Sequence, residues 1–195
     1  MNPLRLAVVQ GSTRDGRLGP VVAKWLFTHA TARADMTVDL IDLAETPLPT
    51  TFPELGRAPA DPADRALLAA VSPRLAAADA FVVVTPEYNH SYPASLKNAI
   101  DWHGREWQAK PVGFVSYGGF SAGLRAVEHL RGVFAELHAV TVREAVGLQG
   151  VWGCFDADGK AVDPASDAAA ASMLDRLAWW AEALREARAK QPYAA

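Results

Sequence analysis

Apolar stretches along the chain are short, and each is followed by a stretch with helical spacing. Buried strands are predicted at residues 4–9, 36–43, 80–85, 111–117 and 139–146. Helices are predicted from Gly19 onward with proline in the first turn, over 64–78, from Pro93 through Ile100, over 124–137 and over 165–189. Because the strands are apolar on both faces and alternate with helices, the pattern predicts an α/β fold. We expect a doubly wound, five-stranded parallel sheet with helices on both faces.

Prolines mark two irregular places in this pattern. Pro73 lies inside the helix predicted over 64–78, and we expect it to bend that helix or end it early. The proline-rich segment 47–62 is long for a loop in a compact domain, so we expect it to cover a site or a partner surface. It is also the only candidate linker, and the sequence shows no internal repeat. We therefore expect residues 1–195 to form a single domain.

Composition limits the kinds of partner. The 195 residues are 50% hydrophobic and 21% charged, with a formal net charge of −3. This balance lacks the electropositive surface that nucleic-acid binding needs, and no apolar run approaches the roughly 20 residues that cross a bilayer. Residues 1–5 lead straight into the first strand without the layout of a signal peptide. We therefore expect a cytoplasmic protein that binds neither nucleic acid nor membrane.

Cysteine and histidine usage narrows the possible chemistry. Cys154 is the only cysteine, which excludes an internal disulfide, a Cys-x-x-Cys redox pair and a multi-thiolate zinc site. The five histidines are scattered without a ligand cluster, so no metal site is predicted. Redox chemistry in this chain would need a bound group.

The loop after the first strand, residues 11–19, combines two hydroxyls, two guanidinium groups and three glycines just before a helix. In doubly wound sheets, ligands bind outside the carboxyl ends of the strands. Free N–H groups at a helix start can hold a phosphate there. We expect a phosphate site in this loop, although it is neither a Walker loop nor a dinucleotide Gly-x-Gly-x-x-Gly fingerprint. The alternative is an ordinary strand-to-helix turn with solvated arginines.

The loops after the third and fourth strands offer backbone groups to a flat ligand. Residues 85–102 contain no glycine and two prolines, which favours a rigid loop. Its backbone groups can face the edge of a heterocycle; the alternative is a polar connection with local aromatic packing. In the later loop, Gly118 and Gly119 allow close approach of their N–H groups to an electron-rich edge.

Residues 119–123 also match the Gly-x-Ser-x-Gly pattern of a hydrolase nucleophile. Such a triad needs an acid and then a histidine further along the chain. The last histidine, His138, follows Ser121 with no strand between them to carry the acid. We therefore interpret Ser121 as a helix cap rather than as a nucleophile.

Three motifs occur in order at the ends of the first, third and fourth strands. They are Gly11-Ser12-Thr13-Arg14, Pro86-Glu87-Tyr88-Asn89-x-Ser91-x-Pro93-x-x-Leu96-Lys97-Asn98-Ala99-Ile100-Asp101-Trp102, and Ser116-x-Gly118-Gly119. The middle motif is long and specific, and the other two are weak alone. Together with the strand pattern they resemble the NAD(P)H-dependent FMN reductase family. These flavodoxin-like enzymes include flavin, quinone, azo-dye and chromate reductases.

The resemblance implies a set of FMN-binding residues. Ser12, Arg14, Arg17, Leu18 and Gly19 would surround the FMN phosphate; Pro86, Glu87, Tyr88 and Asn89 would line the isoalloxazine; and Ser116, Tyr117, Gly118 and Gly119 would close its other edge. The chain departs from the family at two positions. Arg17 stands where many relatives have a further hydroxyl, and Ala94 stands where glycine is frequent.

The resemblance also implies the function. It indicates a flavoprotein oxidoreductase that passes hydride or electrons from NADPH or NADH through FMN to a small acceptor: a flavin, a quinone, an azo compound or a metal oxyanion. No catalytic side chain is needed because the flavin carries the chemistry, and His90 is a possible substrate contact. The alternative is a non-enzymatic electron carrier of the flavodoxin type, which the net charge of −3 and the arginines of the first loop disfavour. A phospho-accepting receiver would need clustered acids where this chain has residues 10–12.

Four tryptophans are candidates for contacts with a partner subunit. Trp102 and Trp107 follow the third helix, where the resemblance implies a dimer surface; packing on the monomer edge is the alternative. Trp179 and Trp180 cannot both face the core side of the last helix, so one of them is a candidate partner contact. We expect a homodimer or a homotetramer.

Overall fold

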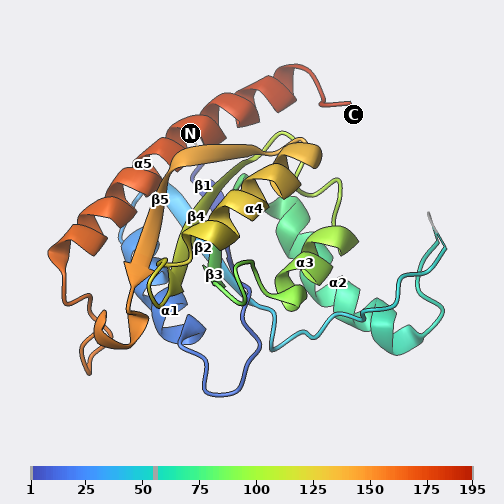
Figure 1. Ribbon diagram of the computed structural model, residues 1–195. Coiled ribbons are helices and arrows are strands. Elements are labelled where there is room, and N and C mark those ends of the chain that lie inside the picture. Colours follow the sequence, from blue (N-terminus) through green and yellow to red (C-terminus); the bar gives the residue numbers. More distant parts are fainter. Residues whose placement is uncertain (1, 55–56, 195) are drawn as a thin grey trace.

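A computed structural model describes residues 2–54 and 57–194, which form a five-stranded parallel sheet between helices (Figure 1). The strands are β1 (Leu4–Gln10), β2 (Met36–Asp42), β3 (Ala80–Pro86), β4 (Pro111–Gly118) and β5 (Val140–Gln149). The helices are α1 (Gly19–Thr31), α2 (Pro62–Ala77), α3 (Ala94–Trp102), α4 (Leu124–Glu136) and α5 (Pro164–Lys190), with a short 3-10 turn, Val151–Gly153, after β5. The predicted alternation of strands and helices is confirmed.

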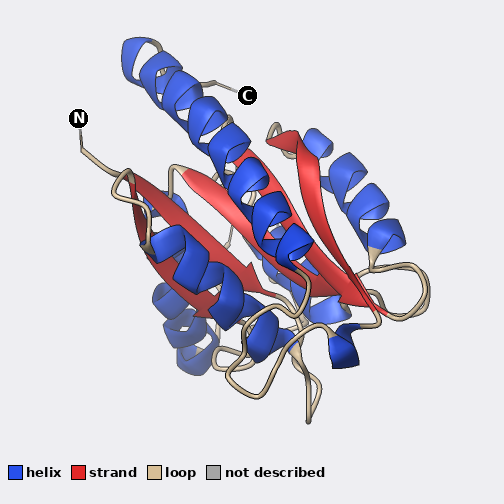
Figure 2. Ribbon diagram, turned by 90° about the vertical axis from the view of Figure 1, so that its left-hand side faces the viewer, coloured by secondary structure: helices blue, strands red, loops and turns tan. Residues whose placement is uncertain are grey.

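The strand order, β2-β1-β3-β4-β5, is that of a flavodoxin-like fold. Successive side chains of a strand point to opposite faces, so Val82 packs with α1 and α5, whereas Val83 packs with α2, α3 and α4. Figure 2 shows these helices on the two sides of the sheet. All seven residues of β3 are buried, as expected of a strand covered on both faces.

Strand register brings the three predicted ligand loops together. Gln10 pairs with Val84, and Val84 pairs with Val115, so β1, β3 and β4 end at the same edge of the sheet. The chain order reverses between β1 and β3, and a crevice forms at such a point outside the carboxyl ends of the strands.

The expectation that Pro73 ends its helix early is wrong. α2 runs to Ala77 with Pro73 inside it. Val71 and Leu75, on either side of the proline, are fully buried, and we attribute the continued helix to this packing, which offsets the one lost backbone hydrogen bond. The helix also begins earlier than predicted, because Asp61 caps it by accepting a hydrogen bond from the Ala63 amide at 2.8 Å.

Residues 48–52 of the proline-rich segment lie against α3. Asn98 Nδ2 donates to the Leu48 carbonyl at 3.0 Å, and Trp102 Nε1 donates to the Pro49 carbonyl at 2.7 Å. Phe52 stacks on Trp102 with ring centroids 4.5 Å apart. Residues 55 and 56 of the segment lie outside the described part of the chain.

The other tryptophans divide between core and surface. Trp107 is 1% exposed and packs between Phe81 and Phe134, which confirms monomer packing for this residue. Trp179 and Trp180 are 64% and 38% exposed, so both lie off the buried stripe of α5. 

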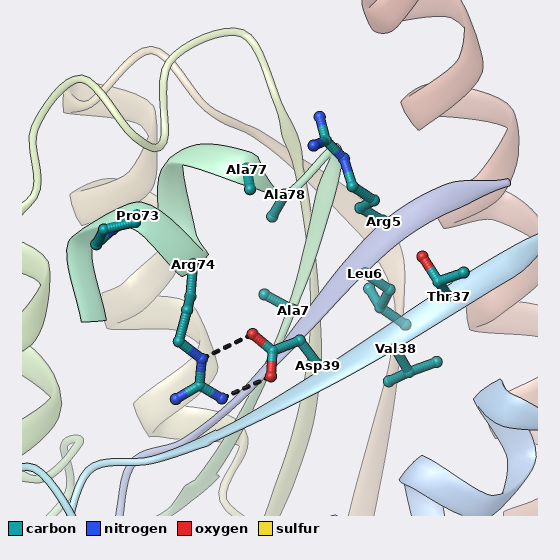
Figure 3. A pocket seen from close by; sticks show the side chains of 10 residues that line it. All are labelled: Arg5, Leu6, Ala7, Thr37, Val38, Asp39, Pro73, Arg74, Ala77 and Ala78. Carbon is teal, nitrogen blue, oxygen red and sulfur yellow. Dashed lines mark hydrogen bonds and ion pairs between the residues drawn. The ribbon is translucent and has the colours of Figure 1, made fainter. Parts of the chain in front are cut away.

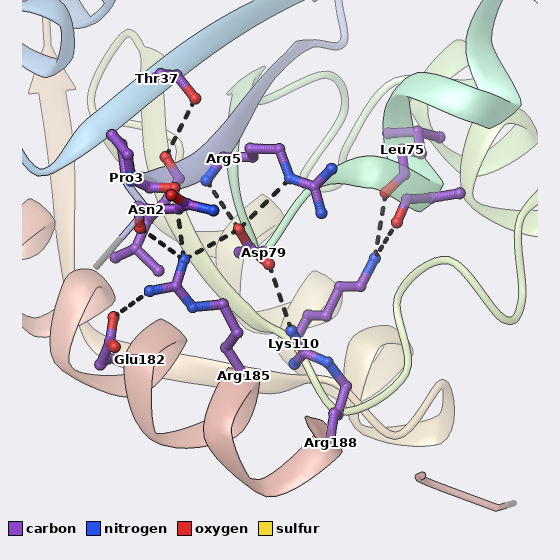
Figure 4. Close-up of polar contacts among 12 residues, drawn as sticks. Asn2, Pro3, Arg5, Thr37, Leu75, Asp79, Lys110, Glu182, Arg185 and Arg188 are labelled. Carbon is purple, nitrogen blue, oxygen red and sulfur yellow. Dashed lines mark hydrogen bonds and ion pairs between the residues drawn. The ribbon is translucent and has the colours of Figure 1, made fainter. Parts of the chain in front are cut away.

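At the edge of the sheet where the strands begin, the buried carboxylate of Asp79 lies near several basic side chains (Figure 4). Asp79 accepts a hydrogen bond from the Arg5 amide at 3.0 Å, and its oxygens lie 3.8 Å from Arg185 Nη1 and 3.7 Å from Arg188 Nη2. Lys110 Nζ donates to the carbonyl of Ala76 at 2.9 Å, at the end of α2. Burial and the charge of Arg188 lower the pKa of Lys110 to about 8, whereas the charge of Asp79 opposes this shift.

Candidate functional site

A cleft of about 220 Å³ opens at the carboxyl edge of the sheet. Its lining is drawn from the loops after β1, β3 and β4 and from the turn after β5: Ser12, Arg14, Gly16, Arg17, Leu18, Pro86, Glu87, Tyr88, Tyr117, Gly118, Gly119, Val151 and Trp152. Ten of the thirteen candidate FMN-binding residues are therefore in the lining. Gly19, Asn89 and Ser116 lie beside it in the chain, and His90 is exposed outside it.

The loop after β1 presents unused backbone donors. Among the described residues, no acceptor is found for the amides of Ser12, Thr13, Arg14, Asp15, Gly16 or Leu18. Most amides in a folded protein are paired, so a run of free N–H groups immediately before α1 is the arrangement that holds an anion at a helix start.

The two arginines of this loop differ in their partners. Arg17 Nη2 lies 2.8 Å from the carboxylate of Asp42 at the end of β2, and its Nη1 donates to the Ser12 carbonyl. Arg17 is thus held by protein groups and fixes the shape of the loop. Arg14 is exposed and lies over the ring of Tyr88 at 5.4 Å, where its guanidinium is available to a ligand.

The loop after β3 contains a tight turn at the cleft. Tyr88 and Ser91 exchange backbone hydrogen bonds of 2.8 and 3.0 Å across Asn89 and His90. Both central residues have positive φ, 49° and 69°, as a type I′ turn requires. Non-glycine residues rarely adopt this backbone, and here it holds Tyr88 in the cleft wall.

A buried hydroxyl in the cleft has no partner. Tyr117 Oη is fully buried and makes no hydrogen bond to any described residue. Ser12 Oγ is close by, but it is already bonded to Tyr88 Oη at 2.8 Å. Burial raises the pKa of Tyr117 and outweighs the opposing effect of the neighbouring Ser12 hydroxyl, so the Tyr117 hydroxyl stays protonated and can donate. A Cβ built on Gly19 would lie 2.9 Å from this hydroxyl, which places it at the start of α1, beside the free amides.

These features fit FMN. A phosphate would find free amides, the guanidinium of Arg14 and the unpaired Tyr117 hydroxyl in the cleft. The resemblance implies the isoalloxazine edge for Tyr117, whereas its hydroxyl lies at the start of α1. The paired glycines Gly118 and Gly119 also line the cleft, and a Cβ on Gly119 would meet nothing within 4 Å. The protein backbone can therefore approach a flat ring there.

We expect Tyr117→Phe to change stability and ligand binding in opposite directions. Removing a buried hydroxyl without a partner should raise the free energy of unfolding of the FMN-free protein by about 1 kcal/mol. The same change removes a donor to the phosphate, so the FMN dissociation constant should rise about tenfold. Urea unfolding and flavin fluorescence titration measure the two effects.

Tyr193→Phe is the matched control, because Tyr193 is exposed and its hydroxyl bonds to His138 outside the cleft lining. It should alter FMN binding by less than twofold. A Tyr117→Phe protein that is less stable than the wild type and binds FMN equally well would contradict this assignment.

The interpretation of Ser121 as the cap of α4 is wrong. The residue at the cap position is Gly123, whose φ is 83°, and no side chain of that position bonds to the helix start. The amide of Arg125, in the first turn of α4, donates to Glu87 Oε2 at 3.2 Å. A carboxylate 38 residues earlier in the chain thus takes the place of a local cap. His138 bonds to the Tyr193 hydroxyl rather than to Ser121, so no hydrolase triad forms around Ser121 within the described part of the chain.

Val151 and Trp152 were missed by sequence reasoning. They belong to the 3-10 turn after β5, and Trp152 is 76% exposed at the cleft rim. Gly150, with φ 59°, ends the strand at this point. A glycine followed by an apolar residue and a tryptophan beyond the last strand is the signal that could have located this wall.

A second cavity, of about 340 Å³, lies away from the predicted loops (Figure 3). It is mainly apolar, lies between the amino halves of β1 and β2 and the end of α2, and is closed on one side by the pair of Arg74 with Asp39. Because no candidate residue lines it, we assign the functional site to the cleft at the carboxyl edge.

Residues 2–54 and 57–194 contain no cluster of three or more histidine, cysteine, aspartate or glutamate side chains that could hold a metal ion. Among the helices described, none has the length and apolar character needed to cross a membrane.

Sequence comparison places residues 4–153 in the family described as NADPH-dependent FMN reductase. A probable NADPH:quinone oxidoreductase of rice (Oryza sativa subsp. japonica) is 32% identical, over 98% of this chain and 96% of the relative. A 2-hydroxy-1,4-benzoquinone reductase of Burkholderia is 31% identical, over 91% and 96%. An NAD(P)H-dependent FMN reductase of Schizosaccharomyces pombe is 38% identical, over 61% of this chain and 60% of the relative.

Structural comparison agrees with the sequence comparison. A flavoenzyme NAD(P)H:(acceptor) oxidoreductase from Paracoccus denitrificans superposes with a TM-score of 0.76 and 26% sequence identity. The match covers 92% of this chain and 97% of the other. The flavodoxin-like fold is confirmed.

Proposed function

Because the chain belongs to the NADPH-dependent FMN reductase family and is an NAD(P)H-dependent flavin oxidoreductase, we propose that its FMN binds in the cleft at the carboxyl edge of the sheet. The observation that carries this proposal is the run of free amides beside the unpaired Tyr117 hydroxyl. Both offer hydrogen-bond donors that a phosphate would accept from.

The residues of the cleft bind and orient the cofactor. Arg14 supplies a charge to the phosphate, and Arg17 holds the loop through Asp42. The turn at Asn89 and His90 holds Tyr88 in the cleft wall, where it would lie against the ring. Bound FMN would supply the hydride and electron transfer between the nicotinamide and a second substrate. The Gly119 amide has no acceptor among the described residues and can donate to the oxygen edge of the ring as negative charge gathers there.

The rim of the cleft favours a flat acceptor. Trp152, which lines the cleft, is 76% exposed, and Phe120, which follows the lining residue Gly119 in the chain, is 90% exposed. Aromatic side chains stack on flat rings. Two of the relatives above are named as quinone reductases. We propose a quinone as the acceptor class for this chain, taken up at the same ring face that the nicotinamide has left.

We further propose that residues 1–195 form one FMN-binding domain that acts in the cytoplasm as a homodimer or homotetramer. The exposed tryptophans of α5 support contact with a second copy. The non-enzymatic electron carrier has no support, because the relatives are named as reductases and oxidoreductases.

Anaerobic half-reactions test the proposal. The purified protein should bind FMN in a one-to-one ratio, and NADPH or NADH should bleach the absorbance of the bound flavin. A benzoquinone should then restore the absorbance. The protein without FMN is the control and should consume no nicotinamide. Bound flavin that neither nicotinamide bleaches would contradict the proposed function.

A further inference from the structure

The Glu87 side chain joins two walls of the cleft. Glu87 lies in the loop after β3, and its carboxylate, 8% exposed, reaches to the loop that leads into α4. Oε1 accepts a hydrogen bond from Arg125 Nη1 at 2.7 Å, and Oε2 accepts one from the Arg125 amide at 3.2 Å. The neighbouring Ser121 hydroxyl helps to hold the pKa of this carboxyl down. One acidic side chain therefore joins the loop after β3 to the start of α4, beside the cleft.

Glu87 remains ionised in this setting. Burial raises the pKa of Glu87, but the hydrogen bonds from Ser121 and Arg125 outweigh it and hold the pKa below its ordinary value. The cleft wall thus carries a negative charge at neutral pH. Its counter-charge is Arg125, which is 44% exposed, whereas the carboxylate is almost covered.

Such a pair matters beside a redox group. Two-electron reduction of FMN with uptake of one proton leaves the bound group one charge more negative. A nearby cation then favours the reduced form, and a nearby anion disfavours it. Glu87 lines the cleft, and Arg125 is paired with it at 2.7 Å without being one of the lining residues, so the two charges act on the cleft with opposite signs.

We propose that Glu87 and Arg125 form a charge-compensated positioning pair that locks the loops after β3 and β4 together and sets the reduction potential of the bound FMN. This inference rests on the proposed function, because it requires FMN in the cleft. Positioning comes from the two hydrogen bonds that the carboxylate accepts from Arg125, and the potential is set by the balance between the carboxylate and the guanidinium.

We expect substitutions of Glu87 and of Arg125 to shift the reduction potential of bound FMN in opposite directions. Glu87→Gln keeps the size of the side chain and an oxygen that accepts from the Arg125 amide, but it leaves the guanidinium uncompensated. Reduced FMN should then bind about tenfold more tightly relative to oxidised FMN, which raises the two-electron potential by about 30 mV. Arg125→Gln leaves the carboxylate uncompensated and should lower the potential by a similar amount. The double variant should return to within threefold of the wild-type affinity ratio.

The experiment measures the potential of bound FMN against a reference dye, together with the FMN dissociation constant and the urea unfolding of the FMN-free variants. Glu128→Gln is the matched control, because Glu128 lies in α4, as Arg125 does. Its side chain is 74% exposed and pairs with Arg131. Its potential should equal that of the wild type.

The outcomes separate this inference from the proposed function. Opposite shifts in the single variants and recovery in the double variant support the pair. Shifts of the same sign, or weaker FMN binding with an unchanged potential in both single variants, would mean that Glu87 is only a structural link and would overturn the inference alone. A wild-type protein that binds no FMN would overturn the proposed function and this inference with it.

Discussion

Gly123→Ala is expected to lower the free energy of unfolding by about 3 kcal/mol. Gly123 has φ 83°, which costs an alanine about 1 kcal/mol. Its new Cβ would lie 2.7 Å from Ser116 Cβ and 2.8 Å from the Tyr117 amide nitrogen, and neither can move because β4 is an inner strand of the sheet. Overpacking of this kind costs a further 1–3 kcal/mol or so. Urea unfolding of the FMN-free protein measures the loss.

The same substitution at Gly132 provides a control of opposite sign. Gly132 lies in the exposed part of α4, and a Cβ there would meet nothing within 4 Å. Alanine favours the helix over glycine by about 1 kcal/mol, so Gly132→Ala should stabilise the protein. Gly123→Ala should also weaken FMN binding about tenfold or more, because the loop from 118 to 123 must move. A Gly123→Ala protein as stable as the wild type would show that this turn can relax freely.

Asp79→Asn is expected to cost about 3 kcal/mol at pH 7, within the range for removing one partner of a buried ion pair. Asparagine keeps the shape and can still accept from the Arg5 amide, but Arg185, Arg188 and Lys110 lose their shared counter-charge. Thermal or urea unfolding measures the loss. Asp158→Asn is the control, since its exposed side chain takes part in no ion pair within the described ranges.

The free energy of unfolding that Asp79→Asn loses should become smaller as pH rises. The folded pKa of Lys110, about 8, lies below its unfolded value of about 10.4. The unfolded chain binds the proton more tightly, so stability rises with pH between these values. Without the charge of Asp79 the folded pKa falls further, so the variant is penalised more at pH 7, where the wild-type Lys110 is mostly charged, than at pH 9.5, where it is mostly neutral. The difference in free energy of unfolding between variant and wild type should therefore be smaller at pH 9.5 than at pH 7. An equal or larger difference at pH 9.5 would contradict this account.

The fold could be predicted from runs of neighbouring residues in the sequence. Contacts between side chains that lie far apart in the sequence could not be predicted in this way. β3 was predictable because its apolar run is buried on both faces. The partner of Arg17 was not, because Asp42 is 25 residues away and the pair forms only when β1 and β2 align. The cap of α4 was missed for the same reason, since Glu87 reaches it from another loop.

The site was predictable to a similar degree. Motifs at the strand ends located most of the cleft lining, because parallel strands end at one edge. The unpaired state of Tyr117 Oη depends on which neighbours its hydroxyl meets after folding, and no spacing along the chain encodes this. The wall formed by Val151 and Trp152 follows a strand that extends three residues beyond the predicted end at residue 146.

The late position of α5 affects the chain while it is being synthesised. Its buried residues Met173, Leu174 and Leu177 complete the core over the α1 side of the sheet. At about 5–20 residues per second, a ribosome needs roughly 2 to 6 seconds to extend the chain from the end of β5 to the last buried residue of this helix. During that interval Val8 and Val82 are covered by α1 but lack the part of their cover that α5 supplies, although the cleft residues are made within its first few residues. We expect the nascent chain to be a substrate for chaperones until its last helix docks.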